Sequence, residues 1–354
     1  MNAPRKHDAA RPGDGTADDA LERAERALAL ACGGPVRLAS WVRLSGGAIQ
    51  ENIAVEARVA SGPHAGTHDW VLRKDAPSAV AASHSRASEF AILRAVHAAG
   101  VLVPEPLFLC AGEGGQDFFA MRRVPGVTAG HRLSKDDALV PDRPGLAREL
   151  GANLARLHRV APPVAALAFL GDAPADGARA CVADYRQGLD ELGALRGEAW
   201  PALEWGLAWC ARHAPAPLPS RLLHRDYRTG NYLVHEGRLT AALDWEFAGW
   251  GDPREDLGWM LARCWRFARP DREAGGIGSA ADFLAGYAAE GGASVTWEET
   301  IYWQVLAHLR WALIALQQAE RHRSGSQASL ELALTAHIVP ELESEILALT
   351  KGRA

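Results

Sequence analysis

The residues best suited to chemistry lie between His224 and Asp244. Asn231 follows Asp226 by five residues, and Asp244 ends the apolar run that comes next. Transfer of a phosphoryl group needs a carboxylate that orients and deprotonates the attacking hydroxyl, and hard oxygen ligands that hold Mg²⁺ against the phosphates. Asp226 fits the first role, and Asn231 and Asp244 fit the second. The spacing therefore indicates phosphoryl-transfer chemistry.

Local structure has to bring these side chains together. The segments 231–235 and 238–243 are typical of two short strands, and Glu236-Gly237 between them is typical of a hairpin turn. Such a hairpin returns its two outer ends, and with them both candidate metal ligands, to the same place. His224 is then expected to be a scaffold residue whose ring hydrogen-bonds to nearby backbone.

A structural interpretation of the same residues is also open. An Asp between a polar loop and a strand is most often a turn-former or a cap, and a His-x-Asp triplet alone is weak evidence. The joint occurrence of His224, Asp226, Asn231 and Asp244 favours the catalytic interpretation, because all four must coincide at this spacing.

The longer motif resembles a known family. Three segments carry the likeness: His-Arg-Asp-Tyr-Arg-Thr-Gly-Asn-Tyr-Leu-Val at 224–234, Leu-Asp-Trp-Glu at 243–246, and Gly-Asp-Pro-Arg-Glu-Asp-Leu at 251–257. They resemble the aminoglycoside phosphotransferase family of kinase-like small-molecule phosphotransferases. The similarity is strongest to its broad "phosphotransferase family protein" branch, which includes the kinase-like domains fused to some acyl-CoA dehydrogenases. The likeness covers most of the chain from about Leu38, but its specificity is concentrated between Leu223 and Leu257.

This resemblance implies a fold, cofactors and a substrate class. The expected fold is α+β and two-lobed, like that of protein kinases, with a small antiparallel sheet in the amino-terminal lobe and a mostly helical carboxy-terminal lobe. ATP or GTP with Mg²⁺ is the expected cofactor set, and the expected partner is a small-molecule hydroxyl acceptor, which need not be an aminoglycoside. We expect residues 1–35 to form a tail and helix, 36–126 the nucleotide-binding lobe, and 127–354 the helical lobe with the catalytic loop and acceptor site.

The amino-terminal lobe is expected to hold a phosphate-binding loop. Strands are expected over 36–43, 52–59 and 69–73. Ser45, Gly46 and Gly47 lie in the first turn, where a loop this small lets backbone N–H groups approach nucleotide phosphates. A plain hairpin turn is the alternative, and the position of the loop in the lobe is the argument for phosphate binding.

The phosphates also need a cation, which the resemblance places on the third strand. Arg73 aligns with the family's usual lysine, and its guanidinium can clamp phosphate oxygens with two hydrogen bonds, but Lys74 is a rival. Glu89, in an amphipathic helix predicted over 82–98, is expected to pair with this cation. The alternative for these charges is a simple solvated surface.

The chain is expected to leave the amino-terminal lobe through a strand over 118–124, where backbone groups from Met121 to Arg123 would face the adenine edge. Further helices are expected over 147–158, 183–195 and 200–213. Asp252 and Asp256 resemble family positions that support the catalytic loop by accepting backbone hydrogen bonds. Asp252 could also be a helix cap, with Pro253 as the first helical residue, and this role is compatible with supporting the loop.

Acceptor recognition is expected from helices after Leu257, including 259–267 and 301–323. Between Gly258 and Gly325 there are seven arginines and seven acids, so the acidic surface that a polycationic aminoglycoside needs is not evident. A neutral or anionic acceptor, such as one with a carboxylate or a CoA-like group, is favoured. The tryptophans of this region are more typical of core than of a pocket. Alternatives are a nucleotide-binding regulatory protein without turnover, which Arg73 would allow, and an antibiotic phosphotransferase.

Composition and charge narrow the remaining possibilities. A chain of 354 residues with 48% hydrophobic content can bury a sizeable core. The net charge of −5 gives no basic field, so neither nucleic acid nor an anionic membrane is expected as a partner. The five cysteines are scattered without metal-type spacing, which predicts reduced thiols and a cytoplasmic location. The polar start of the chain lacks the apolar run of a secretory signal.

Overall fold

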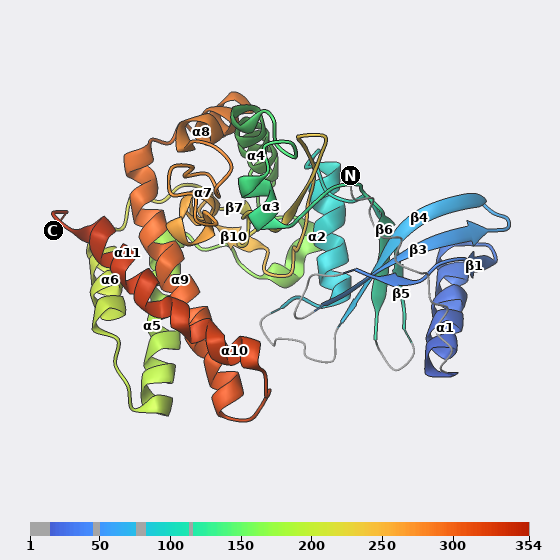
Figure 1. The fold of residues 1–354 in the computed structure, drawn as a ribbon, viewed down its shortest axis with the longest axis horizontal. Coiled ribbons are helices and arrows are strands. Elements are labelled where there is room, and N and C mark those ends of the chain that lie inside the picture. Colours follow the sequence, from blue (N-terminus) through green and yellow to red (C-terminus); the bar gives the residue numbers. More distant parts are fainter. Residues whose placement is uncertain (1–14, 45–49, 76–82, 113–115, 354) are drawn as a thin grey trace. The chain divides into compact units, whose positions relative to one another are not determined.

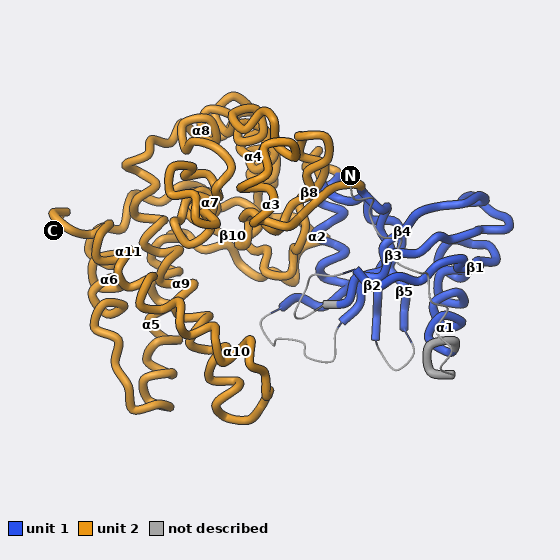
Figure 2. The backbone as a smooth tube through the Cα atoms, viewed as in Figure 1, with its two compact units in different colours: residues 1–97, 103–124 blue, residues 98–102, 125–354 orange. Residues whose placement is uncertain are grey.

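A computed structural model describes residues 15–44, 50–75, 83–112 and 116–353 of the chain. The chain divides into two compact units (Figure 2). Unit 1 contains residues 1–97 and 103–124, and unit 2 contains residues 98–102 and 125–354. Each unit has a hydrophobic core of its own.

Unit 1 is built on a six-stranded antiparallel sheet (Figure 1). Its strands are β1 (Val36–Leu38), β2 (Val42–Arg43), β3 (Gln50–Val59), β4 (Gly66–Asp75), β5 (Pro106–Cys110) and β6 (Phe118–Arg122). The order across the sheet is β1-β3-β4-β6-β5, with β2 also paired to β3. β3 and β4 pair along ten residues each and are longer than the predicted strands 52–59 and 69–73. Branched and aromatic side chains favour such long pairing, because they fit a pleated, buried surface.

Two helices cover opposite faces of this sheet. α1 (Gly15–Cys32) buries Leu28 in the same cluster as Trp70 of β4. α2 (Arg86–Ala98) lies on the other face, where Phe90 packs on Phe119 with ring centroids 5.7 Å apart. Side chains alternate along a strand and cross-strand partners share a face, so Arg73 lies on the α2 face beside its partner Phe119.

Unit 2 is mostly helical (Figure 1). Its helices are α3 (Gly130–Lys135), α4 (Arg143–Leu157), η2 (Ala165–Leu170), α5 (Gly177–Arg196), α6 (Pro201–Arg212), α7 (Arg254–Leu261), η3 (Arg263–Trp265), α8 (Ala280–Ala289), α9 (Trp297–Arg323), α10 (Leu330–Thr335), η4 (Ala336–Ile338) and α11 (Val339–Thr350). Two antiparallel pairs complete it, β7 (Arg221–Leu223) with β10 (Gly249–Gly251) and β8 (Tyr232–His235) with β9 (Arg238–Ala242).

The core of this helical part is formed by α5, α6, α9 and α11. The long helix α9 begins with a capping box, in which the side chains of Thr296 and Glu299 each accept a hydrogen bond from the other's backbone N–H. α7 packs against α9. The long helix therefore positions α7, which carries the residues that support the candidate site.

One predicted helix is wrong. Residues 259–267 do not form a continuous helix, because α7 begins earlier, directly after Pro253, and Ala262 is extended with φ −61° and ψ 139°. Phe267 and Ala268 have φ of 48° and 60°, in the left-handed region that a right-handed helix of L-residues cannot include. The segment after α7 is therefore a loop with the short turn η3 at its start.

Within the described residues, no helix is long and apolar enough to cross a membrane. All five cysteines are free thiols. Cys32, Cys110, Cys181 and Cys210 are buried, which fits small apolar core residues, and Cys264 is partly exposed.

Candidate active site

The hairpin predicted around Glu236-Gly237 is present. These two turn residues have φ of 50° and 76°, and positive φ at both central positions is the geometry of a two-residue type I′ turn. At the open end of the hairpin, the Leu243 backbone N–H donates to the Asn231 carbonyl over 2.8 Å. This bond brings Asn231 beside the residue that precedes Asp244, as the sequence predicted.

Three side chains hold the Asp226 carboxylate. The indole Nε1–H of Trp259 and the guanidinium Nε–H of Arg228 donate to Oδ1 over 2.9 and 3.0 Å. The Asn231 amide donates to Oδ2, and also to the Asp226 backbone carbonyl over 3.0 Å. The Asp226 side chain keeps 15% of its surface exposed. Hydrogen bonds to a charged group are strong, so they fix the carboxylate while part of it stays accessible.

His224 links this carboxylate to the hairpin. Its buried ring accepts a hydrogen bond at Nδ1 from the Asp226 backbone N–H over 3.2 Å and donates from Nε2 to the Leu243 carbonyl over 2.8 Å. One accepting and one donating nitrogen define the neutral tautomer with the proton on Nε2. The prediction that the His224 ring bonds nearby backbone is confirmed.

Asp256 of α7 anchors the same loop. Its fully buried carboxylate accepts from the backbone N–H groups of His224 and Arg225 over 2.7 and 2.8 Å, and from His158 Nε2 over 3.2 Å. Burial by itself raises the pKa of Asp256, but the hydrogen bond and charge of His158, together with His224, lower the pKa overall. These donors hold Arg225 at φ 61°, a left-handed conformation that residues other than glycine seldom adopt.

Asp252 supports a different segment. Its carboxylate accepts from the Leu218 backbone N–H over 3.2 Å, and from the backbone N–H and guanidinium of Arg254. Among the described residues it accepts no bond from the loop that carries Asp226, so only Asp256 matches the predicted support. Asp252 does bond the first turn of α7, although Pro253 is the N-cap rather than the first helical residue.

Residues 40–292 match the family model described as the phosphotransferase enzyme family. The chain belongs to the phosphotransferase enzyme family. The match includes strands β2 to β6 of unit 1 and the hairpin, Asp226 and α7 of unit 2. This family is the one that the motifs at 224–257 resemble.

Among curated proteins, the phosphotransferase chain is similar to acyl-CoA dehydrogenase family member 11 of Rattus norvegicus. The two are 26% identical over 304 residues, which are 81% of this chain and 38% of the relative. The chain therefore spans well under half the length of that relative.

Solved structures of related phosphotransferases show the same fold. A candidate aminoglycoside phosphotransferase from Ralstonia eutropha is 22% identical with a TM-score of 0.67, over 96% of this chain and 98% of that one. Spectinomycin phosphotransferase, solved with ADP and spectinomycin, is 13% identical with a TM-score of 0.60, over 93% and 98%. The predicted α+β, kinase-like fold is confirmed.

In unit 1 of the phosphotransferase, Glu89 pairs with Arg73. Nε of Arg73 lies 2.9 Å from the Glu89 carboxylate, and the two side chains are only 7% and 1% exposed. Arg86 donates to the same carboxylate. Lys74 instead pairs with Glu51 over 2.8 Å and is 40% exposed. Of the two candidate cations, Arg73 is the one held by the helix.

The remaining candidates for nucleotide contact are the predicted phosphate loop and the backbone at the end of β6. The predicted phosphate loop, Ser45 to Gly47, lies outside the described residues. Met121 is buried within β6, and the backbone N–H of Arg123 donates to the Asp69 carbonyl over 3.0 Å. Because this N–H is engaged within the sheet, a base at Arg123 would meet its carbonyl oxygen.

Two of the residues that contact Asp226 were not singled out from the sequence. Trp259 lies three residues after Asp256 in α7, so both lie on one face of the helix, and this spacing was the available signal. Arg228 lies within the motif itself, and its guanidinium sits 4.5 Å from the Trp265 ring centroid. On the other side, Arg310 of α9 sits 4.7 Å from the Trp259 ring centroid. The Trp265 ring therefore supports Arg228, and Arg310 supports Trp259, so both donors to Asp226 Oδ1 are held in place.

Replacing Trp259 with Phe tests the first donor. We expect Trp259→Phe to lower kcat roughly tenfold, because one hydrogen bond to a charged group is lost while the ring still fills its place. The KM for the nucleotide should stay unchanged. Trp205→Phe is the matched control, since it removes one indole hydrogen bond, to Thr350 Oγ1, from a tryptophan of α6 that does not contact Asp226. Equal kcat values for the two variants, measured by steady-state kinetics, would remove Trp259 from the site.

Proposed function

We propose that this chain transfers the γ-phosphoryl group of ATP or GTP, with Mg²⁺, to a hydroxyl group of a small molecule. The observation that carries this proposal is the Asp226 carboxylate, which three side chains hold beside Asn231 at the open end of the hairpin. A fixed carboxylate next to an amide and a second carboxylate is the side-chain set that phosphoryl transfer asks of a protein.

Asp226 orients the acceptor hydroxyl and takes its proton. The acceptor oxygen forms a bond to the γ-phosphorus while the bond from that phosphorus to the bridging oxygen breaks, and the electron pair leaves with the nucleoside diphosphate. A carboxylate has about four lone-pair sites. Oδ1 already accepts bonds from Trp259 and Arg228, whereas Oδ2 accepts one from Asn231. Oδ2 is therefore the oxygen we assign as the base.

Asn231 and Asp244 have donor types that fit Mg²⁺. The Asn231 amide nitrogen points at Asp226, which leaves its amide oxygen directed away from that carboxylate. Magnesium usually takes one or two protein oxygens and completes its shell with water and phosphates. The described residues hold no cluster of three or more His, Cys, Asp or Glu side chains for a metal, which is compatible with such a site. Bound Mg²⁺ would neutralise charge on the transferring phosphates.

On the nucleotide side, we assign Arg73 to the phosphates. A guanidinium carries five N–H donors in a planar fork that matches phosphate oxygens. Glu89 holds the Nε of Arg73, and Nη1 donates to Asn52 Oδ1 over 3.4 Å, so these contacts fix the plane of the fork. Ser45, Gly46 and Gly47 would add backbone N–H groups, and Met121 to Arg123 would border the base. Spectinomycin phosphotransferase, which shares the fold, was solved with ADP, and this supports nucleotide use.

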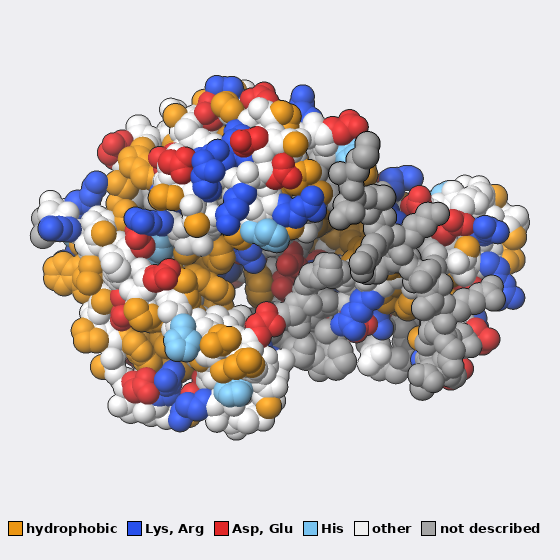
Figure 3. Space-filling view, in the orientation of Figure 1, with side chains coloured by type: hydrophobic (Ala, Val, Ile, Leu, Met, Phe, Trp, Pro, Cys, Tyr) orange, Lys and Arg blue, Asp and Glu red, His pale blue; other side chains and the backbone are white. Residues whose placement is uncertain are grey.

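For the acceptor, we favour a neutral or anionic molecule over a polycationic antibiotic. The seven arginines and seven acids between Gly258 and Gly325 are balanced. On the face of unit 2 seen in Figure 3, basic and acidic side chains are intermingled and form no acidic field. The similarity to an acyl-CoA dehydrogenase family member suggests a hydroxyacyl-CoA type of acceptor. The free thiols support a cytoplasmic location.

A transfer assay tests this function. Wild-type protein is incubated with Mg-ATP or Mg-GTP and hydroxyacyl-CoAs, sugars, amino alcohols or aminoglycosides, and phosphorylated product is detected by mass spectrometry. We expect product from a neutral or anionic acceptor, and none when Mg²⁺ is chelated. Asp244→Ala should weaken binding of the Mg-nucleotide as well as transfer, because it removes a metal ligand.

Two outcomes would favour the alternatives. Tight nucleotide binding without transfer to any acceptor would indicate a regulatory protein that has lost turnover. Transfer only to aminoglycosides would indicate an antibiotic phosphotransferase.

A further inference from the structure

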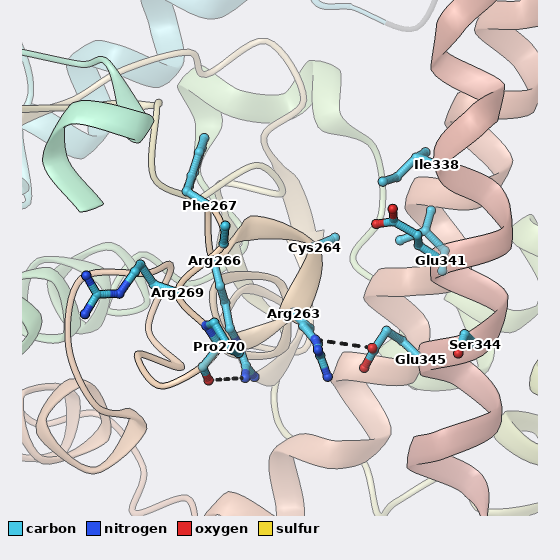
Figure 4. A pocket seen from close by; sticks show the side chains of 12 residues that line it. Arg263, Cys264, Arg266, Phe267, Arg269, Pro270, Ile338, Glu341, Ser344 and Glu345 are labelled. Carbon is cyan, nitrogen blue, oxygen red and sulfur yellow. Dashed lines mark hydrogen bonds and ion pairs between the residues drawn. The ribbon is translucent and has the colours of Figure 1, made fainter. Parts of the chain in front are cut away.

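A pocket of about 450 Å³ lies within unit 2, between the loop that follows η3 and the start of α11 (Figure 4). Arg263, Arg266 and Arg269 line it together with the apolar side chains of Phe267, Ile338 and Leu342. The opposite wall comes from residues 338–345.

Two of the three arginines have carboxylate partners. Arg263 pairs with Glu345 over 3.3 Å, as the dashed line in Figure 4 marks. Arg269 pairs with Asp271 over 3.2 Å. In both ion pairs the carboxylate neutralises the arginine, so neither arginine attracts an anionic ligand strongly.

Arg266 is different, because no carboxylate lies within ion-pair distance of it among the described residues. Within the described residues, its Nη1 and Nη2 groups donate only to the backbone carbonyls of Pro270 and Leu261, over 3.2 and 2.9 Å. Its Nε is buried and has no hydrogen-bond partner in the described part of the chain. Burial lowers the pKa of Arg266, and the attraction of the more distant Glu273 only partly offsets this. A half-buried cation without a counter-ion is costly, and an anion in the pocket would compensate it.

The backbone beside Arg266 also favours a bound anion. Phe267 and Ala268 have φ of 48° and 60°, and the Arg269 N–H closes the turn by donating to the Arg266 carbonyl over 2.8 Å. The N–H groups of Phe267 and Ala268 donate to nothing within the described residues. Unpaired N–H groups in a turn form concave anion sites, and strained turns of this kind recur at ligand sites.

Side-chain packing links the pocket to Asp226. Trp265, between the lining residues Cys264 and Arg266, stacks on Trp259 with ring centroids 5.1 Å apart. Trp259 in turn donates to Asp226. The Arg228 guanidinium, which also bonds Asp226, sits over the Trp265 ring. One layer of tryptophan therefore separates the pocket wall from the proposed catalytic carboxylate.

We propose that this pocket is a second ligand site, separate from the acceptor site at Asp226, and that it binds an amphipathic organic anion with its carboxylate or phosphate group on Arg266 and its apolar part against Phe267, Ile338 and Leu342. Binding at this site does not depend on the proposed phosphotransferase function, because the tryptophan layer keeps the ligand away from Asp226. Glu341 lines the α11 side of the pocket, away from Arg266 (Figure 4). Its charge opposes a second anionic group there, so the pocket selects molecules that are anionic at one end.

Direct binding, measured by calorimetry without nucleotide, tests this inference independently of turnover. The probes are 3-hydroxyoctanoate, glycerol 1-phosphate and the uncharged 1,3-octanediol. We expect saturable binding of 3-hydroxyoctanoate, of glycerol 1-phosphate, or of both, and none of the diol. The two anions distinguish a carboxylate site from a phosphate site. Arg266→Gln should raise the Kd of the bound anion at least about tenfold, because it removes the charge-assisted contact.

Three variants control for folding and charge. Arg266→Lys keeps the charge and should retain part of the binding. Arg323→Gln removes an exposed arginine that pairs with Glu320 at the end of α9, and this variant should bind the anion as the wild type does. Thermal unfolding of each variant checks that it folds. The inference is overturned if neither anion binds the wild type, if the diol binds equally well, or if Arg266→Gln and Arg323→Gln bind alike. Anion binding without any phosphoryl transfer would contradict the proposed function but leave the pocket assignment standing.

Discussion

The Asp226→Asn variant is expected to lose about 10²–10⁴-fold in kcat while its Kd for Mg-nucleotide stays close to that of the wild type. The amide cannot take the acceptor proton, but it has nearly the same shape and still offers an oxygen to Trp259 and Arg228. The loss should fall on kcat, because the interaction is made with the reacting hydroxyl. Steady-state kinetics and nucleotide titration measure the two quantities separately.

Asp184→Asn is the matched control for this variant. Asp184 is an exposed residue of α5, and the same chemical change there should leave kcat at the wild-type value. Asp226→Ala serves as the blank, since it removes the carboxylate and its hydrogen bonds together. Full activity in Asp226→Asn would show that the base lies elsewhere, and the site would have to be reassigned.

The Asp256→Asn variant is expected to lose about 3 kcal/mol of unfolding free energy, together with most of its activity. The buried carboxylate accepts from the backbone of His224 and Arg225 and from His158, so an amide would turn its NH₂ toward at least one donor. Arg225 would then lose the contact that holds its left-handed backbone, and Asp226 follows it directly. Denaturant unfolding measures the stability term, and kcat measures the effect on the loop.

The pH dependence of stability provides a second readout for Asp256. Its pKa is lower in the folded protein than in the unfolded chain. The carboxylate therefore stabilises the fold at pH values above the unfolded pKa, about 3.9, and this contribution is lost as the pH falls through the folded value. Asp256→Asn should remove that part of the acid sensitivity. Asp184→Asn, at an exposed position of α5, is the matched control and should leave stability at the wild-type value at each pH. If the two variants have the same unfolding free energy at every pH, Asp256 does not anchor the loop that carries Asp226.

The local part of the candidate site could be predicted from the sequence. A hairpin depends on its turn residues, and Glu236-Gly237 adopts the positive φ values that a two-residue turn requires. The return of Asn231 to the neighbourhood of Asp244 follows from that turn. The ring of His224 could be assigned to backbone hydrogen bonds, because a buried imidazole must satisfy both nitrogens.

The contacts that depend on packing could not be predicted. Trp259 reaches Asp226 because α7 packs against α9 and the loop. Its spacing of three residues from Asp256 places both on one face of α7, but the sequence does not show what that face contacts. The choice between Arg73 and Lys74 depends on where α2 lies on the sheet, since alternation places the two on opposite faces. The prediction of a helix over 259–267 was wrong, because apolar periodicity does not indicate the left-handed residues that follow α7.

The proposed transfer of phosphate to a hydroxyl acceptor depends on the Asp226 carboxylate. Phosphorus NMR of one sample containing wild-type protein, Mg-ATP and the acceptor found by screening tests it most directly. We predict that a phosphate monoester appears in step with ADP, with little inorganic phosphate, and that Asp226→Asn under the same conditions forms neither product at a comparable rate. Release of ADP with inorganic phosphate alone would contradict transfer to a hydroxyl acceptor, and monoester formation that continues unchanged in Asp226→Asn would contradict the role of Asp226.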